Sequence, residues 1–160
     1  MQNPALMNLT SVFEPDGPIP PRYTCEGRDE SPALRWSEVP DNVRTFVLIV
    51  DDPDAPGGRF VQALAEGIPP VASIAGGGTQ GLNNFGRVGY GGPCPPGGPS
   101  HRYVFTLAAL DRRLGLAPGK RAAHVRKAMQ GHVVAEAQLV ERFQRRAGVG
   151  RGGARGRRAG

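Results

Sequence analysis

The chain has 160 residues, 39% hydrophobic and 21% charged, which suits a globular protein with one hydrophobic core. No apolar run approaches the roughly 18 residues of a membrane-spanning helix, and 24 glycines with 16 prolines argue against a helical bundle. The first residues, Met1 to Ser11, lack the basic start and long apolar run of a secretory signal, so a cytoplasmic location is expected.

The net charge of +6 comes from the C-terminal end of the chain. Residues 145–160 hold six arginines and no acid, so residues 1–144 are neutral overall. From Ala147 onward the composition is glycine, arginine, alanine and one valine, which cannot form a packed core. The sequence therefore predicts one domain over residues 1–146 and a disordered tail over 147–160. A solubilising role is favoured for the tail, with nucleic-acid binding as the alternative.

Four segments have the pattern of strands. They are Met7 to Phe13, Ala33 to Trp36, Thr45 to Asp51 and Tyr103 to Leu110. The third is β-branched and apolar throughout, which predicts a central strand covered on both faces. Residues 59–66 are ambiguous because alanine and leucine are poor strand formers, and residues 76–99 form a long glycine-rich loop.

The C-terminal part of the domain contains helical patterns. Pro118 to Gln130 has the pattern of an amphipathic helix, begun by proline and ended by Gly131. His132 to Gln144 fits both the strand and the helix period, and propensity alone favours a helix. These elements predict a mostly β domain with one or two helices near its C-terminal end.

Two polar turns could form a small site for an anion. Asp52 and Asp54 flank Pro53 at a strand end, although the motif taken alone favours an ordinary surface Asx turn. The loop from Gly91 to Pro96 combines flexible glycines, whose N–H groups can converge on an anion, with stiff prolines. His101 stands at the next strand, and since unperturbed histidine titrates near pH 6.5 it could bind phosphate as a cation.

Several kinds of chemistry lack support. The sequence has no serine-histidine-aspartate order of a hydrolase, no phosphate-binding P-loop and no metal-binding spacing, so neither an enzyme nor a cofactor is predicted. A small hydrolase using Asp52 and His101 as acid and base remains the enzymatic alternative. The two cysteines, Cys25 and Cys94, are interpreted from composition alone as free thiols in a reducing cytoplasm.

Four motifs follow one another along the chain. They are Tyr-Thr-Cys-Glu-Gly at 23–27 with Ser-Pro-Ala-Leu-Arg-Trp at 31–36, Asp-Pro-Asp-Ala-Pro at 52–56, Asn-Phe-Gly at 84–86 with Gly-Tyr-Gly-Gly-Pro-Cys-Pro-Pro at 89–96, and His-Arg-Tyr at 101–103. In this order and spacing they resemble the phosphatidylethanolamine-binding protein family, particularly its bacterial Raf-kinase-inhibitor-like branch. The resemblance extends over residues 7–144.

The resemblance implies a β-sandwich around a large central sheet, with a few peripheral helices and an anion pocket at one end. It favours a strand over residues 132–144, against the propensity argument. It also implies that Cys25 and Cys94 lie close in space. The ligand-binding residues that it implies are Asp52, Gln62, Tyr90, Gly92, Pro95, Pro96, His101 and Tyr103.

One departure from the family pattern affects this pocket. Gln62 stands where the family has a second pocket histidine, and Ala63 where it has a large aromatic residue. Glutamine can donate a hydrogen bond but carries no positive charge, so anion affinity should be lower. The resemblance implies a non-catalytic binding protein for phosphate- or carboxylate-bearing ligands, such as phospholipid head groups or phospho-residues. It leaves open a protein kinase or protease as a partner, and a homodimer.

Overall fold

The computed structural model describes residues 5–11, 14, 17–28, 34–55, 60–68, 73–74, 79–80, 84–85, 92–95 and 99–144. These residues form nine β-strands, one 3-10 helix and one α-helix. In chain order the elements are β1 (Ala5–Leu6), β2 (Asn8–Ser11), η1 (Pro21–Tyr23), β3 (Leu34–Ser37), β4 (Thr45–Asp52), β5 (Phe60–Ile68), β6 (Ser73–Ile74), β7 (Thr79–Gln80), β8 (His101–Leu110), α1 (Ala122–Met129) and β9 (Val133–Phe143).

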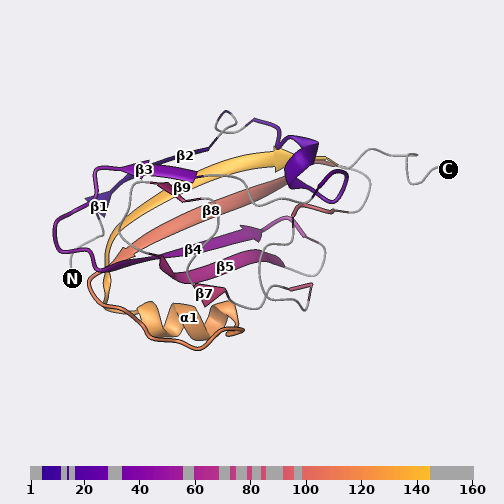
Figure 1. The fold of residues 1–160 in the computed structure, drawn as a ribbon. Coiled ribbons are helices and arrows are strands. Elements are labelled where there is room, and N and C mark those ends of the chain that lie inside the picture. The colour runs from indigo at the N-terminus through magenta and orange to yellow at the C-terminus, as the bar shows by residue number, and fades with distance from the viewer. Residues whose placement is uncertain are drawn as a thin grey trace, which may run out of the picture.

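The strands form two sheets that lie one over the other (Figure 1). The large sheet has the order β1-β9-β8-β4-β5-β7, and the small one the order β2-β3-β6. Neighbouring strands are antiparallel, except that β1 pairs with β9 in parallel. The predicted β-sandwich with a large sheet is therefore confirmed, and β4 lies inside the large sheet as its apolar sequence predicts.

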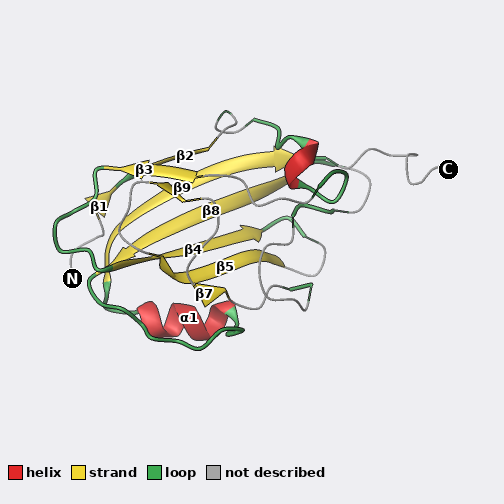
Figure 2. Ribbon diagram, in the orientation of Figure 1, coloured by secondary structure: helices red, strands yellow, loops and turns green. Residues whose placement is uncertain are grey.

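Alternation along β4 and β8 supplies two hydrophobic cores, one on each face of the large sheet. Side chains such as Phe46 and Phe105 face the small sheet, where Phe46 packs on Trp36 with ring centroids 5.2 Å apart. The intervening residues, such as Val47, pack with Val125 of α1 on the opposite face. The helix covers one face of the sheet and the small sheet the other (Figure 2), because β4 is apolar on both faces.

The C-terminal elements correct one prediction and decide another. The helix begins at Ala122 rather than Pro118, because Gly119 has a left-handed φ of 85° that interrupts a helical path. Gly131, with φ 81°, follows the end of the helix as predicted. The helical interpretation of residues 132–144 is wrong. This segment is strand β9, which pairs along almost its whole length with β8, as the family resemblance implied.

The remaining segments agree in part with the sequence predictions. The expected strand over residues 7–13 is present as β2, and residues 12–13 lie outside the described part of the chain. The ambiguous segment 59–66 is strand β5, whose pairing with β4 outweighs its poor strand propensity. Most of the glycine-rich stretch 76–99 and the whole predicted tail, 147–160, lie outside the described residues.

Candidate anion-binding site

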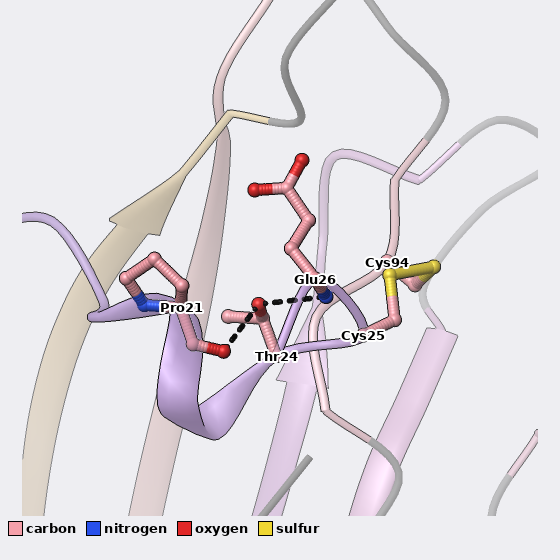
Figure 3. Close-up of a disulfide and its surroundings, with 5 residues drawn as sticks. All are labelled: Pro21, Thr24, Cys25, Glu26 and Cys94. Carbon is pink, nitrogen blue, oxygen red and sulfur yellow. Dashed lines mark hydrogen bonds between the residues drawn. A yellow bond between two sulfur atoms is a disulfide. The ribbon is translucent and has the colours of Figure 1, made fainter. Parts of the chain in front are cut away.

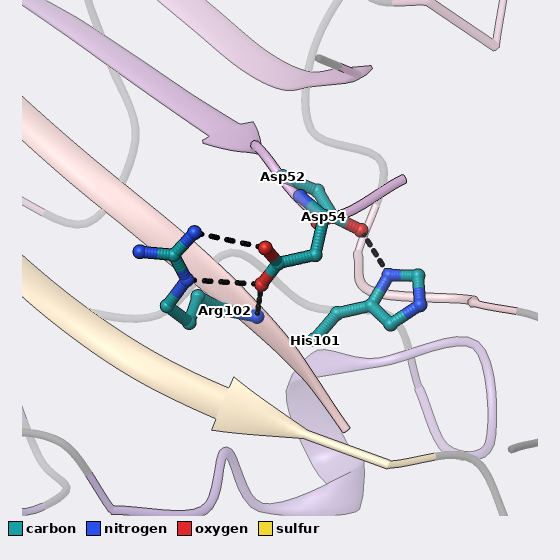
Figure 4. A network of polar contacts seen from close by, with 4 residues as sticks. All are labelled: Asp52, Asp54, His101 and Arg102. Atoms are coloured by element: carbon teal, nitrogen blue, oxygen red, sulfur yellow. Dashed lines mark hydrogen bonds and ion pairs between the residues drawn. The ribbon is translucent and has the colours of Figure 1, made fainter. Parts of the chain in front are cut away.

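The C-terminal end of β4 and the N-terminal end of β8 lie side by side at one end of the large sheet, because the two strands are antiparallel neighbours. This arrangement brings together Asp52, the last residue of β4, and His101, the first residue of β8. His101 Nδ1 lies 2.6 Å from Asp52 Oδ2, and the two side chains are only 11% and 5% exposed (Figure 4). Residues 49 positions apart thus form a buried acid–base pair.

The second oxygen of the Asp52 carboxylate is held by the turn that follows the strand. The backbone N–H of Asp54 donates to Asp52 Oδ1 at 2.8 Å, which closes an Asx turn around Pro53. Asp52 is therefore an Asx-turn residue whose carboxylate also contacts His101. Its carboxylate is fixed from two sides, so the orientation of the imidazole that it holds is fixed as well.

The pairing with Asp52 determines what His101 can offer to a ligand. An ionised carboxylate can only accept hydrogen bonds, so with Asp52 ionised the Nδ1–H of His101 donates to Asp52 Oδ2. The ring nitrogen that is left available to a ligand is then Nε2. This nitrogen accepts a hydrogen bond when the ring is neutral and donates one, with charge assistance, when the ring is an imidazolium.

Asp54 and Arg102 form a second pair beside the first. Arg102 donates to the Asp54 carboxylate through its backbone N–H at 2.8 Å, Nε at 3.0 Å and Nη2 at 2.8 Å. The side-chain hydrogen bonds, followed by the backbone one, lower the pKa of Asp54 from 3.8 to about 2. Arg102 is exposed, as alternation along the strand predicts, and its charge is also paired with that of Asp54. The pair ties the turn after β4 to the start of β8, which holds Asp52 and His101 in register.

Gln62, the expected replacement for a pocket histidine, lies at an irregularity in β5. Val50 pairs with Ala63 and Asp51 with Val61, so position 62 is an extra residue on the β5 backbone. Such bulges re-aim side chains and are frequent beside functional sites. Position 62 is two residues from Phe60, the strand partner of Asp52. The backbone at position 62 therefore lies near the same end of the sheet as Asp52.

The expected loop lies at the same end of the sheet. Gly92, Pro93 and Pro95 are buried. In Figure 4 the ribbon of residues 92–95 passes the imidazole of His101, and in Figure 1 it lies near the start of β8. Two other expected site residues, Tyr90 and Pro96, lie outside the described part of the chain.

A disulfide joins this loop to the one that follows η1. Cys25 and Cys94 are bonded, with their Cα atoms 5.4 Å apart (Figure 3). The closeness implied by the family resemblance is confirmed, whereas the interpretation as free thiols is wrong. Composition could not reveal the bond, because two cysteines 69 residues apart carry no signal of proximity by themselves.

Tyr103 has a fully buried neighbour that the sequence analysis did not single out. Tyr103 follows His101 on the same face of β8, and its partner on β9 is Glu141, which is 0% exposed. Glu141 Oε2 accepts the backbone N–H of Gly17 at 3.2 Å. The signal was present in the sequence, since Glu141 continues the inward-facing series of Ala137 and Leu139.

A groove of about 460 Å³ borders the site. Its lining residues include Pro21, Glu26, Ser100 and Phe143, and Ser100 directly precedes His101. Neither Asp52 nor His101 lines the groove, so the groove lies beside the acid–base pair and does not contain it. Within the described ranges no group of three or more histidine, cysteine and acidic residues could hold a metal ion. No helix in the described part of the chain has the length and apolar character needed to cross a membrane.

Comparisons with known proteins agree on one family. The phosphatidylethanolamine-binding protein family model matches residues 9–144. A UPF0098 protein of Pyrococcus horikoshii is 44% identical, over 88% of this chain and 77% of its own. A crystal structure of a phosphatidylethanolamine-binding protein homologue from Chlamydia trachomatis aligns with a TM-score of 0.83 at 38% identity, covering 88% of this chain and 99% of the other.

A second solved structure, that of Escherichia coli YbcL, described as a member of the mammalian family, aligns with a TM-score of 0.80 at 28% identity. It covers 88% of this chain and 99% of its own. The two-sheet fold agrees with these solved structures, and the matching family is one of binding-type proteins. This chain belongs to the phosphatidylethanolamine-binding protein family.

Proposed function

We propose that the chain binds small anions that carry a phosphate group at the His101–Asp52 pair, without transforming them. The observation that carries the proposal is the 2.6 Å contact between the two side chains, both almost fully buried at the end of the sheet. Asp52 orients the ring and Nε2 meets the ligand. A protonated His101 would then give the phosphate oxygen a charge-assisted hydrogen bond in a site of restricted solvent access.

The same chemistry fits two sources of phosphate. A phospholipid head group and a phosphorylated side chain both present a phosphate oxygen to an imidazolium, and a carboxylate would do so more weakly because it carries less charge. Modulation of a protein kinase or protease would follow from capture of a phospho-residue. Parallel titrations with glycerophosphate, phosphoserine and acetate would rank these ligand classes.

The test is a phosphate titration of the full chain by calorimetry, for the native protein and for His101→Gln. Glutamine keeps a hydrogen-bonding group but no charge, so affinity at pH 6 should fall about tenfold to a hundredfold. His124→Gln is the matched control, because His124 is exposed on α1, which packs on the opposite face of the sheet. Equal affinities for the native chain and His101→Gln would remove the pair from the role.

One observation favours the enzymatic alternative enough to require its own test. A histidine that donates Nδ1–H to a buried aspartate is oriented as the general base of a hydrolase would be. In the oxidised chain both cysteines are in the disulfide, so a nucleophile would have to be water or a side chain other than cysteine. Incubation with p-nitrophenyl phosphate and p-nitrophenyl acetate should give no turnover above that of His101→Gln. Turnover that disappears in this variant would replace the binding proposal by a hydrolase.

A further inference from the structure

The disulfide connects the candidate anion site to a second, pre-formed part of the fold. Cys94 belongs to the loop of residues 92–95, which passes His101, and Cys25 follows the 3-10 helix η1. Sixty-nine residues separate the two cysteines, so the bond links segments that are distant in the chain. A change in this bond therefore acts on a loop at the same end of the sheet as the candidate site.

The Cys25 side of the bond is rigid without the disulfide. Thr24 is fully buried, and its Oγ1 donates to the Pro21 carbonyl at 2.9 Å and accepts the Glu26 N–H at 3.2 Å (Figure 3). The backbone N–H of Thr24 also donates to Pro21, and that of Gly27 to Thr24. Local hydrogen bonds therefore hold this turn in its conformation independently of the disulfide.

The Cys94 side depends more on the cross-link. Pro93 and Pro95 have no N–H group, so half of the backbone donors of residues 92–95 are missing. A backbone hydrogen bond from Cys25 N–H to the Pro93 carbonyl, 3.2 Å long, lies beside the disulfide. It is weaker than the covalent bond, and it joins Cys25 to the residue that precedes Cys94. Loss of the disulfide should therefore loosen residues 92–95 rather than the turn that holds Cys25.

The bond can be reached by a reductant. Cys25 is exposed and Cys94 is partly exposed, which places the disulfide at the surface, where a thiolate in solvent can approach it. Access distinguishes this bond from a buried structural disulfide, which thiols reach only when the protein unfolds. The chain has no other cysteine, so any effect of a thiol reductant on this protein reports on this bond.

We propose that the Cys25–Cys94 disulfide is a redox switch of the anion site: the oxidised chain holds residues 92–95 against the site, and the reduced chain binds anions more weakly. The inference rests on the proposed phosphate binding at His101. In a reducing cytoplasm, the location expected from the sequence, the switch would be open. In an oxidising compartment it would be closed.

The chemistry is a thiol–disulfide exchange with a dithiol reductant. A thiolate of the dithiol attacks one sulfur, most directly that of the exposed Cys25, and the bond between Cys25 and Cys94 breaks to release the Cys94 thiolate, which takes up a proton. The second thiol of the reductant then attacks the mixed disulfide and releases Cys25 as a thiol. Two electrons and two protons pass to the protein, and the dithiol becomes a cyclic disulfide.

The experiment compares the full oxidised chain with the same chain reduced by dithiothreitol, using inorganic phosphate as the probe. If reduction leaves the closed loop populated about a tenth of the time, phosphate affinity falls about tenfold. The variant Cys25→Ser with Cys94→Ser should bind like the reduced chain and should not respond to dithiothreitol. Reversible reduction of the native chain keeps the test decisive if this variant fails to fold.

A second measurement separates this inference from the proposed function. Amide hydrogen exchange at Gly92 and Cys94 should accelerate on reduction, while exchange at Thr24 and Gly27 should change little. By linkage, phosphate should protect the disulfide against reduction by the same factor by which reduction weakens phosphate binding. A native oxidised chain that does not bind phosphate would overturn the proposed function. Unchanged affinity with unchanged exchange would overturn the switch.

Discussion

Two neighbouring aspartates at the end of β4 have different surroundings. Asp51 faces α1, where Arg126 Nη2 donates to its Oδ2 at 3.1 Å. Asp52 faces the opposite side of the sheet, where it holds His101. Successive residues of a strand point to opposite faces, so one carboxylate attaches a helix to the sheet while the next one holds the histidine of the candidate site. Identical residue types one position apart can therefore be tested for different roles.

The largest expected effect concerns the helix side of this pair. Arg126→Gln leaves the Asp51 carboxylate, 4% exposed, without its guanidinium, which should lower the free energy of unfolding by about 1–3 kcal/mol. Urea unfolding measures the change, with the exposed Lys127→Gln as control. Phosphate affinity of the folded variant should equal that of the native chain. A loss of affinity would show that the two faces are coupled.

The next effect concerns the site side. Asp52→Asn keeps an oxygen that can accept the Nδ1–H of His101 but removes the negative charge from this contact, so the ring is oriented less firmly. Phosphate affinity should fall about tenfold, because hydrogen bonds between neutral groups are roughly half as strong as charge-assisted ones. Asp51→Asn is the matched control and should leave calorimetric phosphate affinity unchanged. Tighter binding by Asp52→Asn would mean that repulsion between carboxylate and phosphate dominates.

A gain of affinity is expected at the bulge. Gln62→His places a second ionisable ring at the position where the family has its pocket histidine. Phosphate affinity at pH 6 should rise about fivefold, because a charge-assisted hydrogen bond replaces a neutral one. Gln138→His on β9, an exposed strand position, controls for the added charge. No gain would indicate that the bulge turns position 62 away from the ligand.

The smallest effect is expected from Asp54 and is confined to acid. Its folded-state pKa, about 2, lies below the ordinary value of 3.8, so the ionised form stabilises the fold above pH 4. This contribution is lost as the pH falls from about 4 to about 2. Asp54→Asn should therefore flatten the dependence of unfolding free energy on pH in that window, as measured by urea titration. A variant that keeps the native slope would assign the acid sensitivity to other groups.

The strands that carry the site could be predicted from residue patterns, and the reason is local. Residues 45–51 are mostly β-branched and apolar, so only a central strand covered on both faces can bury their side chains. Residues 132–144 could not be decided in this way, because the small inward residues Ala135 and Ala137 fit either period. Their long pairing with β8 settles the structure, and that information is not local.

For the candidate site, the residues could be predicted from the sequence more easily than the contacts between them. The positions of Asp52 and His101 follow from strand ends, and the structure brings the two side chains together. The contact between Asp54 and Arg102 was missed because alternation places Arg102 on the outer face, where a solvated charge is the ordinary expectation. The turn after β4 curls around to meet it. Such a path depends on the turn geometry, which the residue types alone do not specify.

The parallel pairing of β1 with β9 has a consequence for the order in which the chain can fold. Ala5 is the strand partner of Ala135, and Met7 N–H donates to the Glu136 carbonyl, so the first strand needs a partner that is synthesised almost last. During translation the N-terminal segment must wait while β4, β5 and β8 emerge. Contacts so distant in sequence are slow to form. The pairing of β1 with β9 is therefore a late event in the folding of this protein.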